Sequence, residues 1–142
     1  MWGYLLAALA GAAMSVQGVW NTRLGERIGT DAANAWVQGT AFMLAVAVLL
    51  LRGGGKWDQL LAGPKLYLLG GVLGLISTLT VMQAIGALSP TVAICVILIA
   101  QLLVAALIDA FGLWGTEQAV FGWNKYAGIG LMVAAVLLFK WK

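Results

Sequence analysis

The sequence predicts an all-α integral membrane protein, a bundle of five transmembrane helices that forms one domain over residues 1–142. Composition is the first reason: hydrophobic residues make up 63% and charged residues 9%, whereas soluble domains have roughly 45–50% and about 25%. A mean hydropathy of +0.99 agrees. The last reason is the spacing of the few charges. They separate uncharged stretches that are long enough to cross a bilayer, which takes about 20 helical residues.

The first two spans follow from the positions of the charges. Residues 1–22 carry no charged side chain, and residues 32–51 form a second uncharged run. A helix rises about 1.5 Å per residue, so each run can cross roughly 30 Å of hydrocarbon. We predict spans over residues 2–21 and 33–51.

The other three spans come from the second half of the chain. Residues 66–108 are uncharged and too long for one crossing, so they predict two helices, 66–86 and 90–112. Pro90 suits the first position of the later helix, because proline needs no N–H donor there. The last uncharged run, 126–139, reaches full length as a span over 122–141 if Lys125 extends toward the interface.

Aromatic residues mark the same boundaries. Trp and Tyr collect at membrane–water interfaces, where an apolar ring with one polar edge is best placed. Those at or near the predicted span ends are Trp2, Tyr4, Trp20, Trp36, Tyr67, Trp114, Trp123, Tyr126 and Trp141.

The charges do not favour either orientation. Five crossings place the N-terminus and loops 52–65 and 113–125 on one side (side A), and loop 21–32, turn 87–90 and the C-terminus on the other (side B). Each side receives four Lys or Arg residues, although cytoplasmic loops normally hold a clear excess. Either another cue sets the orientation, or the chain inserts both ways and pairs as an antiparallel homodimer.

Small residues form stripes on three of the predicted helices. Gly3, Ala7, Gly11 and Ser15 recur every four residues, and shorter pairs occur at Gly70/Gly74 and Gly130/Ala134. Such stripes let helix backbones approach closely in lipid. We expect most of them to pack within one bundle and one or two to face a partner copy.

Six amide side chains lie within the first four predicted spans. They are Gln17, Asn21, Asn34, Gln38, Gln83 and Gln101. The first five fall in the side-B half of the membrane, because the first and third helices end there and the second begins there. This cluster predicts a hydrated cavity that opens on side B, with Gln101 deeper. The alternative is that the amides form interhelical hydrogen bonds, typically about 0.6 kcal/mol each.

Asp109 is the one carboxylate within a predicted span. It lies roughly 12 Å from the middle of its helix, so a structural role near the interface is favoured over proton or ion coupling. The chain has no His, and no grouping of residues predicts a metal site, a cofactor site or a nucleophile with its base. We therefore expect no enzyme activity. The eight basic residues are dispersed, so we expect no nucleic-acid partner.

Two segments resemble a known family. Residues 15–25, with Gln17, Asn21, Leu24 and Gly25, are similar to a Q-x3-N-x-x-L-G signature at the end of helix one. Residues 100–112 are similar to a Q-L-L…D-x-F-G signature that runs from Gln101 to Gly112. Both resemble the YdcZ-type family of the drug/metabolite transporter superfamily, and the similarity covers the whole chain.

The resemblance implies a fold and a function. Ten-span relatives contain two five-span halves in inverted orientation, so this chain corresponds to one half. Four-span relatives carry a central glutamate on helix one, where this chain presents Gln17; the departure argues against proton-coupled export of cations. The expected protein is a transporter of the bacterial inner membrane that works as an antiparallel homodimer by alternating access.

The expected substrate is a small metabolite or drug-like molecule. The predicted substrate-binding residues are Gln17, Asn21, Gln38, Gln83 and Gln101. The alternative is a non-transporting membrane subunit of a larger complex.

Overall fold

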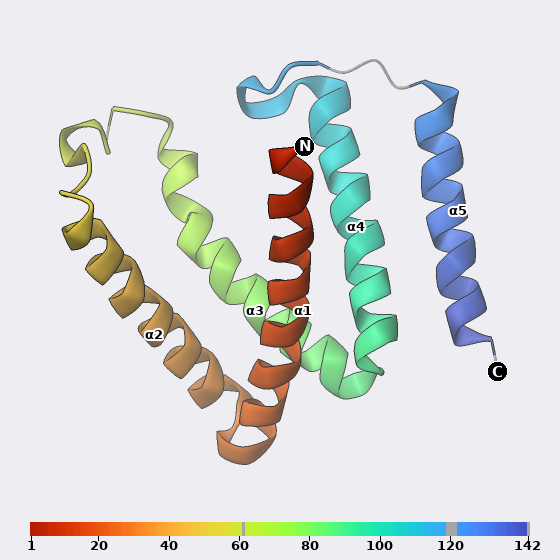
Figure 1. Ribbon diagram of the computed structural model, residues 1–142, viewed down its shortest axis with the longest axis horizontal. Helices are drawn as coiled ribbons and strands as arrows, with labels where there is room; N and C mark the ends of the chain where they lie inside the picture. The colour runs from red at the N-terminus through yellow and green to blue at the C-terminus, as the bar shows by residue number, and fades with distance from the viewer. Residues whose placement is uncertain (61, 119–121, 142) are drawn as a thin grey trace. The chain divides into compact units, whose positions relative to one another are not determined.

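A computed structural model describes residues 1–60, 62–118 and 122–141. Over these ranges the chain is helical and has no strand, as predicted. It divides into two compact units, Met1–Gly86 and Ala87–Lys142. The first contains α1 (Trp2–Ile28), α2 (Thr30–Leu51) and α3 (Gly70–Ala87, which ends one residue beyond the unit), and the second contains α4 (Pro90–Phe111) and α5 (Trp123–Lys140) (Figure 1).

A single residue joins α1 to α2. Gly29 has φ 91° and ψ 143°, a region that residues with a Cβ essentially avoid. Its N–H still donates to the Gly25 carbonyl at 2.9 Å, and its carbonyl accepts from the Ala33 N–H at 3.0 Å. The chain therefore changes direction at a residue whose own N–H and carbonyl both remain hydrogen-bonded.

Helix α1 continues beyond the predicted end of the first span at residue 21. Charged residues mark where lipid ends, but they do not end a helix. Arg23 and Glu26 form an exposed ion pair at 2.9 Å on the added turns, a spacing that suits a helix surface. Helix α1 ends where the first glycine with positive φ occurs.

Helix α3 packs against the second half of α1. A Cβ at Gly18 would lie 2.9 Å from Ile85 Cδ1, and a Cβ at Gly25 would lie 2.8 Å from Met82 Cε. Between them, the Thr22 hydroxyl donates to the Met82 carbonyl at 3.4 Å. Glycine at these two positions lets the helices approach closely, as small residues do in membrane bundles.

The buried residues of the first unit gather near the α1–α2 junction. They are Gly18, Asn21, Thr22, Ala33, Asn34, Met82 and Ile85. Most of the large apolar side chains elsewhere in the described chain are exposed. This inverts the arrangement of a soluble domain and is expected when the surrounding solvent is lipid.

In the second unit, α4 begins where the sequence predicted. Pro90 is at the first position, and the Ser89 hydroxyl caps the helix by accepting from the Val92 N–H at 3.4 Å. Helix α4 ends at Phe111, and the Gly112 that follows it is left-handed at φ 59°. Gln118 Nε2 then donates to the Ala110 carbonyl at 2.9 Å, which satisfies one of the carbonyl groups left open at the helix end.

Within the described ranges, four segments are long and apolar enough to cross a membrane: Trp2–Ile28, Thr30–Leu51, Lys65–Ala87 and Pro90–Phe111. The third includes a short 3-10 turn over Lys65–Leu69 before α3. The fifth predicted span corresponds to α5, which has 18 residues and covers about 27 Å. Its apolar part, Trp123–Phe139, is shorter than the other four segments.

Candidate functional site

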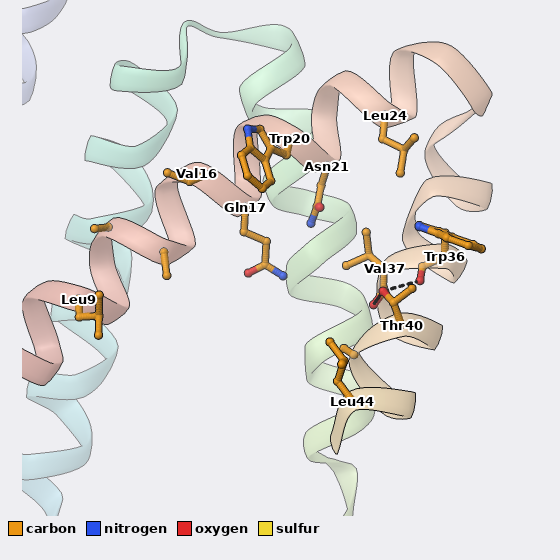
Figure 2. A pocket seen from close by; sticks show the side chains of 13 residues that line it. Leu9, Val16, Gln17, Trp20, Asn21, Leu24, Trp36, Val37, Thr40 and Leu44 are labelled. Carbon is orange, nitrogen blue, oxygen red and sulfur yellow. Dashed lines mark hydrogen bonds between the residues drawn. The ribbon is translucent and has the colours of Figure 1, made fainter. Parts of the chain in front are cut away.

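A groove of about 790 Å³ lies between α1 and α2. The two helices meet at Gly29 and diverge from it, so the groove lies where their facing sides separate (Figures 1 and 2). All of its described lining residues come from these two helices. They are Leu9, Ala12, Ala13, Val16, Gln17, Trp20, Asn21 and Leu24 from α1, and Trp36, Val37, Thr40, Ala41 and Leu44 from α2.

Two amides provide most of the polar groups in this groove. Gln17 and Asn21 are four residues apart on α1 and therefore share a face. Figure 2 shows both side chains directed into the space between the helices. Asn21 is 7% exposed, whereas Gln17 is exposed. An amide has both donor and acceptor atoms, so the pair can bind a ligand group of either kind.

Apart from Thr40, the rest of the described lining is apolar or aromatic, and none of the described lining residues is ionisable. Trp20 and Trp36 come from opposite helices near the junction end and are both largely exposed. The Thr40 hydroxyl donates to carbonyls of its own helix, those of Trp36 and Val37, both at 3.0 Å, and its oxygen lone pairs remain. The groove therefore offers hydrogen bonds and flat apolar surfaces, without a compensating charge.

The two amides of α2 do not line this groove. Gln38 Nε2 donates to Thr78 Oγ1 of α3 at 3.4 Å, the interhelical hydrogen bond that was the alternative to a substrate contact. Asn34, one turn earlier, is 2% exposed, and its Oδ1 has no hydrogen-bond partner among the described residues. These side chains belong to the packed part of the first unit.

The remaining predicted residues lie elsewhere. Gln83 is exposed on α3, beside the buried Met82 that faces α1, and it is not part of the groove lining. Gln101 is exposed on α4 in the second unit. The structure thus brings Gln17 and Asn21 into one groove, and the roles of Gln38, Gln83 and Gln101 in substrate binding remain predictions.

A second groove, of about 540 Å³, lies between α4 and α5. Asp109 and Lys125 line it together with six uncharged residues: Leu102, Ala105, Ala106, Gly128, Ile129 and Met132. The Asp109 carboxylate makes no hydrogen bond or ion pair within the described ranges. At the end of α4, the side chains of Thr116 and Gln118 donate hydrogen bonds to the carbonyls of Ile108 and Ala110.

Comparison with protein families decides the identity of the chain. Residues 2–138 match the family model described as "Putative inner membrane exporter, YdcZ". The chain belongs to this family. No curated protein and no solved structure matches the chain significantly.

Membership of the YdcZ family agrees with the four long apolar segments. This YdcZ-family chain is a multi-pass protein of the inner membrane, and its family is one of exporters. The resemblance read from Gln17, Asn21 and the segment around Asp109 is thereby confirmed.

Part of the groove in this YdcZ-family protein was not predicted from the sequence. Trp20 and Trp36 were interpreted as interfacial anchors, and Thr40 was not singled out, but all three line the groove. A signal was available. Thr40 and Trp36 lie four residues apart and therefore share a face of α2, and that face differs from the one that carries Asn34 and Gln38.

Proposed function

We propose that this protein exports a neutral or zwitterionic small molecule that binds in the α1–α2 groove. The observation that carries the proposal is the lining: two amides and two tryptophans, with no ionisable side chain among the residues described there. A substrate with a net charge would lose its hydration there without gaining a counter-charge, which is costly in a low-dielectric site. The free-energy cost of losing hydration is much smaller for a molecule without net charge whose donors and acceptors can bond to the amides.

In this proposal each part of the groove has a distinct role. Gln17 and Asn21 bind polar groups of the substrate, because each amide can donate and accept. Trp20 and Trp36 supply flat surfaces against which a ring of the substrate can pack. The volume of about 790 Å³ suits a metabolite or a drug-sized molecule.

We further propose that the working unit is an antiparallel homodimer that operates by alternating access. The support is the equal number of Lys and Arg residues on the two predicted sides, together with the odd number of predicted spans. Many transporters contain two inverted halves, and two oppositely inserted copies would supply them. Each copy would then present one α1–α2 groove to one side of the membrane.

Replacing Gln17 tests the site. We expect Gln17→Leu to abolish uptake of a substrate identified with the purified protein in proteoliposomes, because the substrate loses a polar partner in an apolar groove. Folding should persist, since Gln17 makes no hydrogen bond to described residues and one interhelical bond is worth only about 0.6 kcal/mol. Binding should be measured beside uptake, by titration in detergent.

The matched control is Gln59→Leu, the same chemical change in the short helical turn Trp57–Gln59, outside the groove. This variant should transport like the wild type. Equal transport by Gln17→Leu and wild type would contradict the assignment of the groove. Failure of the wild-type protein to transport any solute alone would favour the alternative function, a non-transporting subunit of a larger complex.

A further inference from the structure

The α4–α5 groove has its two charged residues at one end. Asp109 lies two residues before the end of α4, and Lys125 is the third residue of α5. The helices are consecutive, so the end of one and the beginning of the next lie on the same side. With 22 residues, α4 spans about 33 Å, so this end lies at the level where hydrocarbon gives way to headgroups.

The rest of the groove is apolar and runs toward the middle of the membrane. Along α4 it extends from Asp109 to Leu102, and along α5 from Lys125 to Met132. Each wall covers eight residues, whose seven helical rises give about 10 Å of depth. Gly128 borders the open space of the groove, because a Cβ there would meet no atom within 4 Å.

We propose that this groove binds one phospholipid whose headgroup carries both a phosphate and a primary ammonium, as phosphatidylethanolamine does. The ammonium donates to the Asp109 carboxylate, and Lys125 donates to a phosphate oxygen. The beginning of one acyl chain lies against Leu102, Ala105 and Met132. This site is separate from the α1–α2 groove and does not depend on the proposed transport function.

Charge complementarity selects this lipid among those of a bilayer. A phosphatidylglycerol headgroup has no cation for Asp109. A phosphatidylcholine headgroup has one, but its methyl groups leave no N–H to donate. Charge-assisted hydrogen bonds are about twice as strong as neutral ones, so the primary amine should be preferred. A free solute of the same headgroup chemistry would leave the apolar part of the groove unfilled.

Native mass spectrometry of the full-length protein, released from detergent with one added lipid at a time, tests the proposal. The probes are phosphatidylethanolamine, phosphatidylcholine and phosphatidylglycerol with identical acyl chains. We expect one phosphatidylethanolamine per chain, bound about tenfold more tightly than phosphatidylcholine, the factor that one charge-assisted hydrogen bond gives. Asp109→Asn should remove that preference and leave phosphatidylglycerol binding unchanged.

A pair of glycine variants on α5 tests the groove itself. Gly128→Leu places a side chain into the groove and should reduce binding of all three lipids. Gly130→Leu is the matched control: it adds the same side chain two residues along, where there is also open space, but Gly130 does not line the groove. It should bind lipid like the wild type.

Three results would overturn the proposal. One is equal binding of the three lipids by the wild-type protein. Another is displacement of the lipid by an equal concentration of soluble phosphoethanolamine, which would mean that the apolar groove contributes nothing. The third is a Gly128→Leu protein that keeps its lipid but loses its dimer, which would identify the groove as an interface between copies of the chain.

Discussion

Gly29 sets the geometry of the α1–α2 hairpin. Its φ of 91° with ψ of 143° is a combination in which a Cβ would clash with the adjacent backbone. We expect Gly29→Ala to lower the free energy of unfolding by about 1–3 kcal/mol, the cost of holding such a conformation. Equilibrium unfolding of the purified protein in mixed micelles would measure the loss.

Gly39→Ala is the control for this change. Gly39 lies within α2, has no positive φ, and a Cβ there would meet no atom within 4 Å. Alanine is a better helix former than glycine by up to about 1 kcal/mol, so this variant should be as stable as the wild type or more so. Similar losses for the two variants would show that the Gly29 conformation does not constrain the fold.

At the scale of helices, the contact of α1 with α3 depends on Gly18. A Cβ there would already lie 2.9 Å from Ile85 Cδ1 and 3.3 Å from Val81 Cγ1. Gly18→Ile would force the helices apart and remove the bond from Thr22 to the Met82 carbonyl. We expect a loss of about 1–3 kcal/mol from overpacking, measured as a reduced unfolding midpoint in detergent.

The same substitution on the open face of α1 provides the comparison. A Cβ at Gly11 meets no atom within 4 Å, so Gly11→Ile should leave the stability of the monomer unchanged. If it instead destabilises the protein only at concentrations where dimers form, the stripe of Gly3, Ala7, Gly11 and Ser15 faces a partner copy. Equal destabilisation by both variants at every concentration would contradict the α1–α3 packing described above.

How far the sequence predicts these elements depends on the type of signal. Pro90 fixed the beginning of α4 because proline restricts the backbone locally. The first helix was predicted to end near residue 21 but continues to Ile28. The charged residues mark the edge of the lipid, whereas the helix itself ends only at Gly29. Signals from single residues therefore predicted where the helices lie in the chain. They did not predict how far a helix continues beyond the lipid.

The site was less predictable than the helices. Gln17 and Asn21 were predicted to be neighbours because they lie in the same half of the membrane and are four residues apart on one helix. The structure confirms that they share a face. The membrane half and the helical spacing could not separate this pair from Gln38, whose amide donates to Thr78, because the direction of a face depends on which helix packs beside it. That packing is set by contacts such as Met82 against Gly25, which are far apart in sequence.

At the scale of the whole molecule, the balanced charges predict two orientations. A topology reporter at the C-terminus should detect both a cytoplasmic and an external population of the wild-type protein. Gln59→Lys combined with Gly63→Lys adds two positive charges to loop 52–65 and should leave one population, with that loop in the cytoplasm, because Lys and Arg are retained there.

Two lysines on the opposite side provide the control. Ala32→Lys, in the first turn of α2, with Leu88→Lys, between α3 and α4, adds the same charge on side B, so it should fix the chain in the reverse orientation. A wild-type protein found in one orientation only would contradict dual topology. Transport by the two fixed variants when expressed together, but by neither alone, would support the antiparallel dimer.

The one-residue link at Gly29 also limits how α1 and α2 can move. Neither helix can slide along the other, since no slack exists between Ile28 and Thr30, so the remaining freedom is rotation about a pivot. Helix α1 extends about 40 Å from that pivot, so one degree of rotation moves its far end by about 0.7 Å. Small changes in two torsion angles therefore become a large change of width at the open end of the groove, while the pivot end stays shut.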